Sequence, residues 1–289
     1  MSQPAWIALD WGTSHLRAWL MDAQDKVIER RQSEAGMATL GRTEFASALE
    51  ALVGRFDGPV VACGMVGSRQ GWAEAPYEVT PCAPPSAATA TQVAKVRILP
   101  GIKQTHPAEV MRGEETQIAG YLAKHADFDG VICLPGTHTK WVHISAGEIV
   151  SFRTAMTGEM FALLASQSVL RHSVGLGWDA DAFACAVSET LSRPEGLAAA
   201  LFNIRAASLL NGTEPGTARA RLSGLLIGAE LAAMRPYWLG QAVTLIGSDD
   251  LSSEYANALQ IQGVTAQIAN GEDMTLSGLI AAKSALELT

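Results

Sequence analysis

An acidic residue followed by a glycine and two hydroxyl side chains ends the first apolar segment of the chain, Asp10-Trp11-Gly12-Thr13-Ser14. A glycine lets a backbone turn approach a phosphate group, whose oxygens accept hydrogen bonds from successive N–H groups and hydroxyls. A carboxylate just before such a turn suits Mg²⁺, which is usually held through water. The segment therefore predicts a phosphate-binding hairpin at Gly12, Thr13 and Ser14, with Asp10 as a metal ligand or catalytic carboxylate. The alternative is an ordinary hairpin in which Asp10 caps its own turn.

A second turn of this kind, Pro135-Gly136-Thr137-His138-Thr139, lies about half a chain further on. In both places the strand pattern after the turn carries a basic residue and a tryptophan. These are Arg17 and Trp19 in the first half and Lys140 and Trp141 in the second. The repeat indicates two duplicated domains whose phosphate grips face each other across a cleft. Gly136, Thr137 and Thr139 would complete the grip, and Lys140 either neutralises phosphate charge or faces solvent.

The elements that must position these turns follow from hydrophobic periodicity. In the first half, strands are expected at residues 6–12, 15–22, 26–33 and 59–65. A helix is expected at residues 43–53, with Thr43 as its N-cap. The following stretch to Ala94 is poor in charge and rich in proline, which predicts irregular structure with a short helix. A strand near residues 96–101 and a helix at residues 114–125 close the first half.

The second half repeats the strand pattern after a turn at residues 128–130. It then changes to helices rich in Ala and Leu and poor in charge, which is typical of helices packed against one another. They are expected at residues 158–172, 178–191, 194–210 and 215–234. A final β-α-β-α pattern ends the chain. The layout predicts an α/β fold with two domains, residues 1–128 and residues 129–289, the second with a helical insert.

Composition and charge exclude several classes of partner. The 289 residues are 48% hydrophobic and carry a formal net charge of −8, whereas a surface that binds nucleic acid is normally basic. No uncharged apolar run reaches the roughly 18–20 residues needed to cross a bilayer, and the N-terminus lacks the features of a secretory leader. We therefore expect a cytoplasmic protein without nucleic-acid or membrane partners.

Common nucleotide and hydrolase motifs are missing from the sequence. There is no G-x-x-x-x-G-K-[ST], no G-x-G-x-x-G after the first strand, no H-E-x-x-H and no G-x-S-x-G. The four cysteines are widely spaced and form no C-x-x-C pair. Cys63 and Cys133 lie in strand patterns, where we expect them to be small buried hydrophobic residues.

The two glycine–threonine hairpins make the chain resemble the sugar kinase–actin–heat-shock ATPase superfamily. The resemblance implies two ribonuclease-H-like domains with an interdomain cleft that holds ATP. The third signature of that superfamily is a glycine-bearing adenosine turn after a late strand, and Gly247-Ser248 looks like it, although one glycine stands where two are common. The run from Ser223 to Gly228 either lines the same pocket or packs helices through small residues.

Six strings narrow the resemblance to the 2-dehydro-3-deoxygalactonokinase family, and they extend over nearly the whole chain. They are ALDWGTSHLRAW, GMVGSRQGW, MRGEETQIAG, LPGTHTKW, TAMTGE and LSGLLIGAEL. The resemblance implies ATP-dependent phosphorylation of the 6-hydroxyl of 2-dehydro-3-deoxy-D-galactonate in galactonate breakdown, with ATP and Mg²⁺ as cofactors. The choice between galactonate-derived and gluconate-derived epimers stays open.

Two carboxylates are candidates for the catalytic base. Phosphoryl transfer depends mostly on positioning and charge neutralisation, with limited work for a base. Glu115 follows Arg112-Gly113-Glu114 and resembles the catalytic glutamate region of exopolyphosphatases, but acidic residues in a first helical turn also favour the helix dipole. Asp10 is the rival for this role, and the sequence does not decide between them.

A sugar acid also brings a carboxylate, which suits a fork-like guanidinium. Arg69, in the glycine-rich loop GSRQGW, is the first candidate, and Arg112 and Arg153 are in reserve. Trp72 either stacks on the sugar or packs back onto its own domain. The Thr157-Gly158-Glu159 segment either approaches the substrate or only begins a helix.

Two other functions compete with the kinase. One is a phosphohydrolase on the same scaffold, in which Glu115 activates water. The other is a nucleotide-driven regulator or filament protein, which the short chain leaves little room for. Exposed tryptophans would be compatible with a homodimer.

Overall fold

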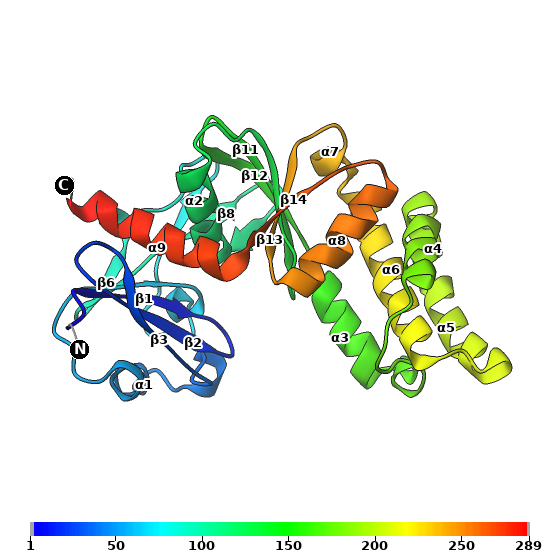
Figure 1. Cartoon of the computed structure of the whole chain (residues 1–289), viewed down its shortest axis with the longest axis horizontal. Coiled ribbons are helices and arrows are strands. Elements are labelled where there is room, and N and C mark those ends of the chain that lie inside the picture. Colours follow the sequence, from blue (N-terminus) through cyan, green and yellow to red (C-terminus); the bar gives the residue numbers. More distant parts are fainter. Residues whose placement is uncertain (1–2, 288–289) are drawn as a thin grey trace. The chain divides into compact units, whose positions relative to one another are not determined.

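The computed structural model describes residues 3–287, and the chain forms two compact units. The first unit contains the chain up to Asp129, the segment Ile144–Ser151 and the chain from Gly271 onward. The second contains Gly130–His143 and Phe152–Asn270. Each unit has its own main β-sheet, and the sequence colouring of Figure 1 shows that the last helix, α9, lies beside β1.

The main sheet of the first unit has the predicted strands at its centre. In spatial order it consists of β3 (Val27–Ser33), β2 (Leu16–Met21), β1 (Trp6–Trp11), β4 (Val60–Cys63), β7 (Val96–Ile98) and β6 (Thr91–Val93). β2 is antiparallel to β1 and β3, whereas β4 is parallel to β1 and β7 is parallel to β4. Asp10 therefore lies at the carboxyl end of β1, level with Cys63 of β4.

Side chains of β1 alternate between the two faces of this sheet. Its odd-numbered residues pack in one core with α1 (Phe45–Val53). Trp6 and Ala8 pack on the other face, in a core with α9 (Gly271–Glu287). Asp10 has the same parity as Trp6 and Ala8, so its carboxylate belongs to the α9 face.

Helix α1 begins two residues later than predicted, and Thr43 is not its N-cap. Glu44 occupies the N-cap without a side-chain bond to the helix. Its carboxylate instead accepts a hydrogen bond from the Gly41 N–H at 2.5 Å, which closes a turn before the helix.

Helix α9 also crosses α2 (Glu114–Lys124) at very close range. A side chain at Gly120 would collide with the Met274 carbonyl, and one at Gly278 with the Thr116 carbonyl. The predicted division into residues 1–128 and 129–289 differs from the two compact units at α9 and at Ile144–Ser151, which both belong to the first unit.

A small sheet precedes α2. Its strands, in order, are β5 (Tyr77–Val79), β8 (Gly101–Gln104) and β9 (Glu109–Met111). The stretch from Thr80 to Ala94 contains β6 and the 3₁₀ turn η3 (Ala87–Thr89). It is thus more regular than predicted, because strands of three residues are too short to show a period in the sequence.

The main sheet of the second unit repeats the strand order of the first. In space it runs β12 (Glu148–Ala155), β11 (Thr139–Ser145), β10 (Gly130–Leu134), β13 (Val243–Gly247) and β14 (Gln267–Asn270). Both sheets thus begin with the order third, second, first, fourth; the first sheet then continues with β7 and β6, and the second with β14. This duplication confirms the predicted α/β class with two ribonuclease-H-like units, the fold of actin-like ATPases and sugar kinases.

The helical insert of the second unit is confirmed. Its helices and 3₁₀ turns are α3 (Thr157–Gln167), η4 (Val169–His172), α4 (Ala180–Ser192), η5 (Pro194–Gly196), α5 (Leu197–Asn211), α6 (Pro215–Ala233) and α7 (Arg235–Trp238), and α8 (Asp249–Ile261) follows β13. Helix α6 packs along α4, α5 and α3. Ser223 to Gly228, on α6, are all buried.

The cysteines are as expected. All four are free thiols, and Cys63 and Cys133 are buried. Among residues 3–287, no helix has the length and apolar content needed to span a bilayer.

Candidate active site

The first predicted phosphate hairpin connects β1 and β2. The Gly12 N–H donates to the His15 carbonyl at 2.9 Å, which closes the turn, and Thr13 and Ser14 are exposed at its tip. A 3₁₀ turn, η1 (Met37–Thr39), supports the hairpin from behind. Its first two N–H groups donate to the Gly12 and Thr13 carbonyls at 3.0 and 2.9 Å. The Gly12 and Thr13 carbonyls are thus hydrogen-bonded on the side of the hairpin that faces η1.

Gly36 makes this support possible. A side chain at this position would collide with the backbone of Thr13 and Ser14. Only a residue without a side chain brings η1 close enough for both N–H groups to reach the hairpin.

The second hairpin, between β10 and β11, is held in the same way. The Glu159 N–H at the start of α3 donates to the Thr137 carbonyl at 3.0 Å. A side chain at Gly158 would collide with the Gly136 carbonyl. His138 Nε2 also pairs with Glu159 Oε2 at 2.6 Å. The Thr157–Glu159 segment is therefore a helix start that fixes the phosphate hairpin.

Sequence reasoning missed Gly36 and did not assign this role to Gly158. A signal was present, because each glycine follows the third strand of its repeat: Gly36 comes 24 residues after Gly12, and Gly158 comes 22 residues after Gly136.

Asp10 lies beside the first hairpin, with 19% of its side chain exposed. Its Oδ2 accepts a hydrogen bond from Arg17 at 2.9 Å, and its Oδ1 lies 4.0 Å from Cys63 Sγ. Burial raises the pKa of Asp10 and the Arg17 charge partly offsets this rise. Leu134 holds the equivalent position before the second hairpin, so the acid is present in one half only.

Glu115 is buried, with 1% exposure, in the first turn of α2. Both of its carboxylate oxygens accept from the Gly113 N–H, at 2.8 and 2.7 Å. Burial, assisted by the neighbouring Glu114 charge, raises its pKa from 4.5 to about 7. That value suits a general base near neutral pH.

Asp10 and Gly113, the residue before α2, both lie close to Gly64. A side chain at Gly64 would lie 3.5 Å from Asp10 Oδ1, and one at Gly113 would lie 3.4 Å from the Gly64 Cα. The charges of Asp10 and Glu115 both raise the pKa of the Cys63 thiol, after its burial. The end of β4 therefore brings Asp10 and the start of α2 together.

The second unit contains a cavity of about 350 Å³ beside its hairpin. Gly136 and Thr137 line it together with Ser248 and Ser223. Apolar walls come from Phe161, Trp178, Leu226 and Ile227. Gly247 lies next to the hairpin, because a side chain there would be 3.4 Å from the Pro135 carbonyl oxygen. The structure thus brings the predicted phosphate hairpin, the predicted adenosine turn and the α6 run together.

A buried carboxylate that sequence reasoning missed connects the walls of this cavity. Glu230 of α6 accepts hydrogen bonds from Trp141 Nε1 at 2.7 Å, from Tyr255 OH at 2.8 Å and from Thr157 Oγ1. Burial raises its pKa, and these hydrogen bonds oppose the rise. Tyr255 OH also lies 2.9 Å from Thr139 Oγ1. Each partner comes from a different element, so no local pattern in the sequence reveals the network.

This network also places Thr139 and Lys140. Thr139 is completely buried and bonded to Tyr255, so it supports the hairpin from within. Lys140 is 4% exposed and its Nζ lies 3.4 Å from the His138 carbonyl oxygen. The solvent-facing interpretation of Lys140 is therefore wrong, because its strand is covered on both faces.

The three candidate arginines differ sharply in burial. The side chain of Arg69 is 81% exposed and pairs with Glu74 at 3.7 Å, and Arg153 is exposed on β12. Arg112 is only 9% exposed. Its Nη2 donates to the Ala75 carbonyl at 2.8 Å and its guanidinium lies 4.2 Å from the centre of the Tyr77 ring.

Arg112 nevertheless has unused hydrogen-bonding capacity. Its Nε and Nη1 are buried and have no hydrogen-bond partner among residues 3–287, and the same holds for Ser68 Oγ. Both residues adjoin Gly67, because a side chain at Gly67 would lie 2.9 Å from Arg112 Nη1. Buried donors are rarely left unpaired in folded proteins.

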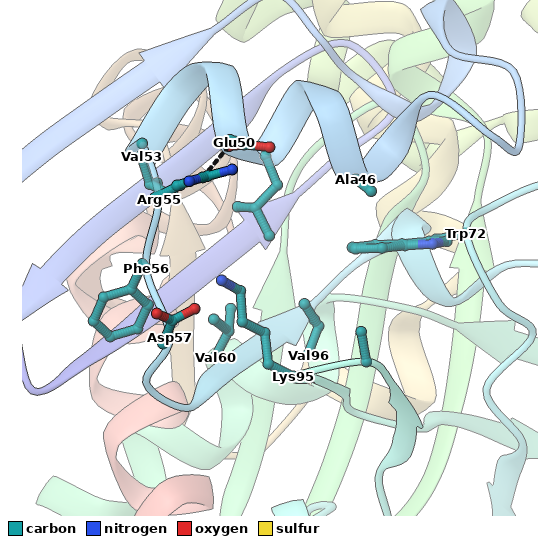
Figure 2. Close-up of a pocket in the computed structure, with 13 residues that line it drawn as sticks. Ala46, Glu50, Val53, Arg55, Phe56, Asp57, Val60, Trp72, Lys95 and Val96 are labelled. Carbon is teal, nitrogen blue, oxygen red and sulfur yellow. Dashed lines mark ion pairs between the residues drawn. The ribbon is translucent and has the colours of Figure 1, made fainter.

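Trp72 packs back onto its own domain, which was the alternative interpretation. Its ring is stacked on Phe45 at 6.1 Å and edge-on to Trp11 at 6.0 Å. It also lines a separate cavity of about 490 Å³ below α1, whose other end holds Phe56 and Lys95 (Figure 2). Trp11 and Asp10 point to opposite faces of the sheet, so Trp72 lies on the face away from Asp10.

Comparisons with known proteins agree with this geometry. Residues 10–282 match the family model of 2-keto-3-deoxy-galactonokinase. A probable 2-dehydro-3-deoxygalactonokinase of Rhizobium meliloti is 39% identical, and a 2-dehydro-3-deoxygalactonokinase of Escherichia coli is 37% identical; the alignments cover 96% and 95% of this chain and 96% of each relative. The crystal structure of a putative 2-dehydro-3-deoxygalactonokinase from Sinorhizobium meliloti superposes with a TM-score of 0.89 at 37% identity, covering 97% of this chain and 99% of that one.

The glycine support of the second hairpin gives a first prediction. Gly158→Ala is expected to push the Gly136–Thr137 backbone out of position, because the new methyl group would collide with the Gly136 carbonyl. A displacement of about 1 Å at a phosphate grip costs on the order of 100-fold in rate. Steady-state kinetics should show this loss in kcat/KM for ATP.

Ser166→Ala is the matched control, because Ser166 is exposed on the same helix and its hydroxyl bonds only the Ala162 carbonyl in the described structure. This variant should keep normal kinetics. A Gly158→Ala enzyme with an unchanged kcat/KM for ATP would refute the role given to Gly158.

Proposed function

The chain belongs to the 2-keto-3-deoxy-galactonokinase family, and from this premise we propose how its residues carry out the reaction. It is a kinase, a phosphotransferase with an alcohol as acceptor. The reaction moves the γ-phosphoryl group of ATP to the 6-hydroxyl of 2-dehydro-3-deoxy-D-galactonate, in galactonate degradation. We place it in the cytoplasm, where ATP is available.

The observation that carries the assignment of the nucleotide site is the cavity of the second unit. Adenine and ribose would lie between its apolar wall and Ser248, and the phosphates would extend to Gly136 and Thr137, which line the same cavity. The Gly12–Ser14 hairpin is the proposed second grip on the phosphates. Its exposed hydroxyls and N–H groups suit phosphate oxygens.

Mg²⁺ fits the chemistry of Asp10. Mg²⁺ at phosphate sites is typically bound through one or two carboxylates, several waters and the phosphates themselves. Asp10 offers one such carboxylate, and only its Oδ2 is engaged by Arg17. Residues 3–287 contain no cluster of three His, Cys, Asp or Glu side chains that would bind a resident metal. Asp10 would hold the ion that accompanies ATP, which neutralises phosphate charge.

Glu115 is the proposed base. Its two accepted hydrogen bonds from Gly113 fix the carboxylate, and burial brings its pKa to the working range. In the reaction the sugar 6-oxygen forms a bond to the γ-phosphorus as the bond to the ADP oxygen breaks. The hydroxyl proton passes to Glu115.

Arg112 is the proposed partner of the sugar-acid carboxylate, in preference to Arg69. Its two buried N–H groups without partners form a ready donor pair, and Ser68 supplies a third donor. Arg69 has most of its side chain in solvent, where an ion pair contributes little. Gly67 lies close to Arg112 Nη1, and we propose that the loop that contains Gly67 and Ser68 opens as the sugar acid enters.

The comparisons give no support to the competing functions. The relatives that cover at least 95% of the chain are named as kinases. Neither the phosphohydrolase nor the regulator or filament hypothesis gains an observation from the structure.

The test of the function is ADP release measured in a coupled assay with ATP and Mg²⁺. Strong stimulation by 2-dehydro-3-deoxy-D-galactonate is expected, and the gluconate-derived epimer should be tested beside it. Equal ADP release with and without any sugar acid would refute the kinase and favour a hydrolase.

The pH dependence of the reaction distinguishes Glu115 from Asp10 as the base. A base must be deprotonated, so kcat/KM should rise with pH through about 7 and then level off. Glu115→Gln should lower kcat and abolish this rise. Asp10→Asn should also lower kcat but keep the rise. Persistence of the rise in Glu115→Gln would exclude Glu115 as the base.

Glu115→Gln should also raise the free energy of unfolding of the protein. Above its folded pKa, Glu115 is a buried charge, whereas the unfolded chain ionises it in water already above about 4.5. Glu115→Gln is therefore expected to increase the free energy of unfolding above pH 7 by up to about 3 kcal/mol. The gain should disappear below pH 4.5, where both states bind the proton. Urea unfolding at pH 8 and pH 4 measures it.

Arg112→Met should raise the sugar-acid KM about 10-fold to 100-fold, because it removes a charged hydrogen-bonding pair while keeping apolar volume. Arg69→Met is the control and should change this KM little. An analogue with an amide in place of the carboxylate should be a poorer substrate than the acid for the unaltered enzyme. Its kcat/KM should be no lower with Arg112→Met than with the unaltered enzyme. If Arg112→Met still prefers the acid to the amide by the original factor, another group binds the carboxylate.

A further inference from the structure

Helix α5 has an apolar stripe on each of two opposite faces. The inward stripe, centred on Ala200 and Ile204, is buried in a core with α6. The outward face exposes 63% of Phe202, 65% of Leu209 and 83% of Leu210. A helix that is apolar on all sides is normally covered on all sides. Within residues 3–287 the outward stripe of α5 has no such cover.

The outward face of α5 also carries almost no charge. Between Leu197 and Asn211 the only charged residue is Arg205. Its guanidinium donates to Ser173 Oγ at 3.3 Å, within the same unit. A partner with a charged surface would lose hydration there without finding an opposite charge. The face therefore suits an equally uncharged surface.

The spacing of the outward stripe is that of a helix-pairing seam. Ala199, Phe202, Ala206 and Leu209 are separated by three, four and three residues, which is the a/d spacing of helices that pack side by side. Along the stripe, small and large residues alternate.

This alternation is complementary to itself when two copies of α5 run antiparallel. A twofold axis level with residue 204 places Phe202 opposite Ala206 of the second copy, and Ala199 opposite Leu209 of the second copy. Each large side chain then faces a small one, which is how closely packed helices interdigitate. A twofold interface must be self-complementary in this way.

We propose that the protein forms a homodimer in which the α5 helices of two copies pack antiparallel through this stripe. The helix of 15 residues is about 22 Å long. Val169 of η4, which is 54% exposed and belongs to an element in contact with α5, would extend the interface. Such an extension is needed because stable interfaces bury about 800 Å² on each partner.

The first test is the mass of the full chain in solution, measured by sedimentation over a range of concentrations. A dimer has twice the chain mass of 30.5 kDa. Phe202→Asp should weaken association on the order of 100-fold, because it buries a charge at the centre of the seam. Leu239→Asp is the control: Leu239 is 59% exposed but lies beyond α7, and this variant should remain dimeric.

A swap of large and small residues tests the antiparallel register. Ala206→Phe should weaken the dimer, because two phenylalanines would then compete for one space. The double variant with Phe202→Ala and Ala206→Phe should restore it, since each Phe again faces an Ala. Circular dichroism confirms folding of every variant. A monomer at all concentrations, an unaffected Phe202→Asp dimer, or a double variant weaker than Ala206→Phe would each overturn the proposal.

Discussion

The proposed site depends on how closely a 3₁₀ turn or a helix start can approach the back of each predicted phosphate hairpin. A hairpin that offers its N–H groups to phosphate turns its carbonyls away, and those carbonyls need hydrogen-bond donors of their own. In the first unit the N–H groups that follow Gly36 supply those bonds, and in the second unit the N–H group after Gly158 does so. The absence of a side chain at each glycine sets the distance. The duplication therefore includes the support as well as the hairpin.

The two halves then diverge according to their tasks. The first unit carries the acid before its hairpin and the buried Glu115, so acid–base chemistry and metal binding are proposed there. The second unit has Leu134 at the equivalent position and a cavity beside its hairpin instead. Glu230 joins two residues that line that cavity, Thr157 and Tyr255, through buried hydrogen bonds, and also accepts one from Trp141 of β11. One repeat has thus become the proposed catalytic half and the other the proposed nucleotide-binding half.

A net charge of −8 is unfavourable for an enzyme with two anionic substrates. Local positive groups can offset the repulsion between this net charge and the anionic substrates. Arg112 is desolvated, so its charge acts at full strength. Backbone N–H groups of the hairpins add partial positive charge without changing the net charge.

Local patterns in the sequence predicted the local features of the fold. Strand alternation placed both hairpins, and the repeated turn gave the duplicated sheet, because each depends on neighbours in the chain. Long-range contacts were out of reach: α9 joins the first unit through backbone contacts at Gly120 and Gly278, and Trp72 packs on the face opposite to Asp10. The burial of Arg112 and the exposure of Arg69 were equally hidden, since their sequence surroundings are similar in polarity.

The destination of the phosphoryl group is the most direct test of the account. The product formed from ATP and 2-dehydro-3-deoxy-D-galactonate can be examined by ³¹P nuclear magnetic resonance with proton correlation. The account predicts a phosphate ester coupled to the two protons on carbon 6, formed in equal amount with ADP. Release of inorganic phosphate in place of this ester, with the sugar acid unchanged, would contradict it.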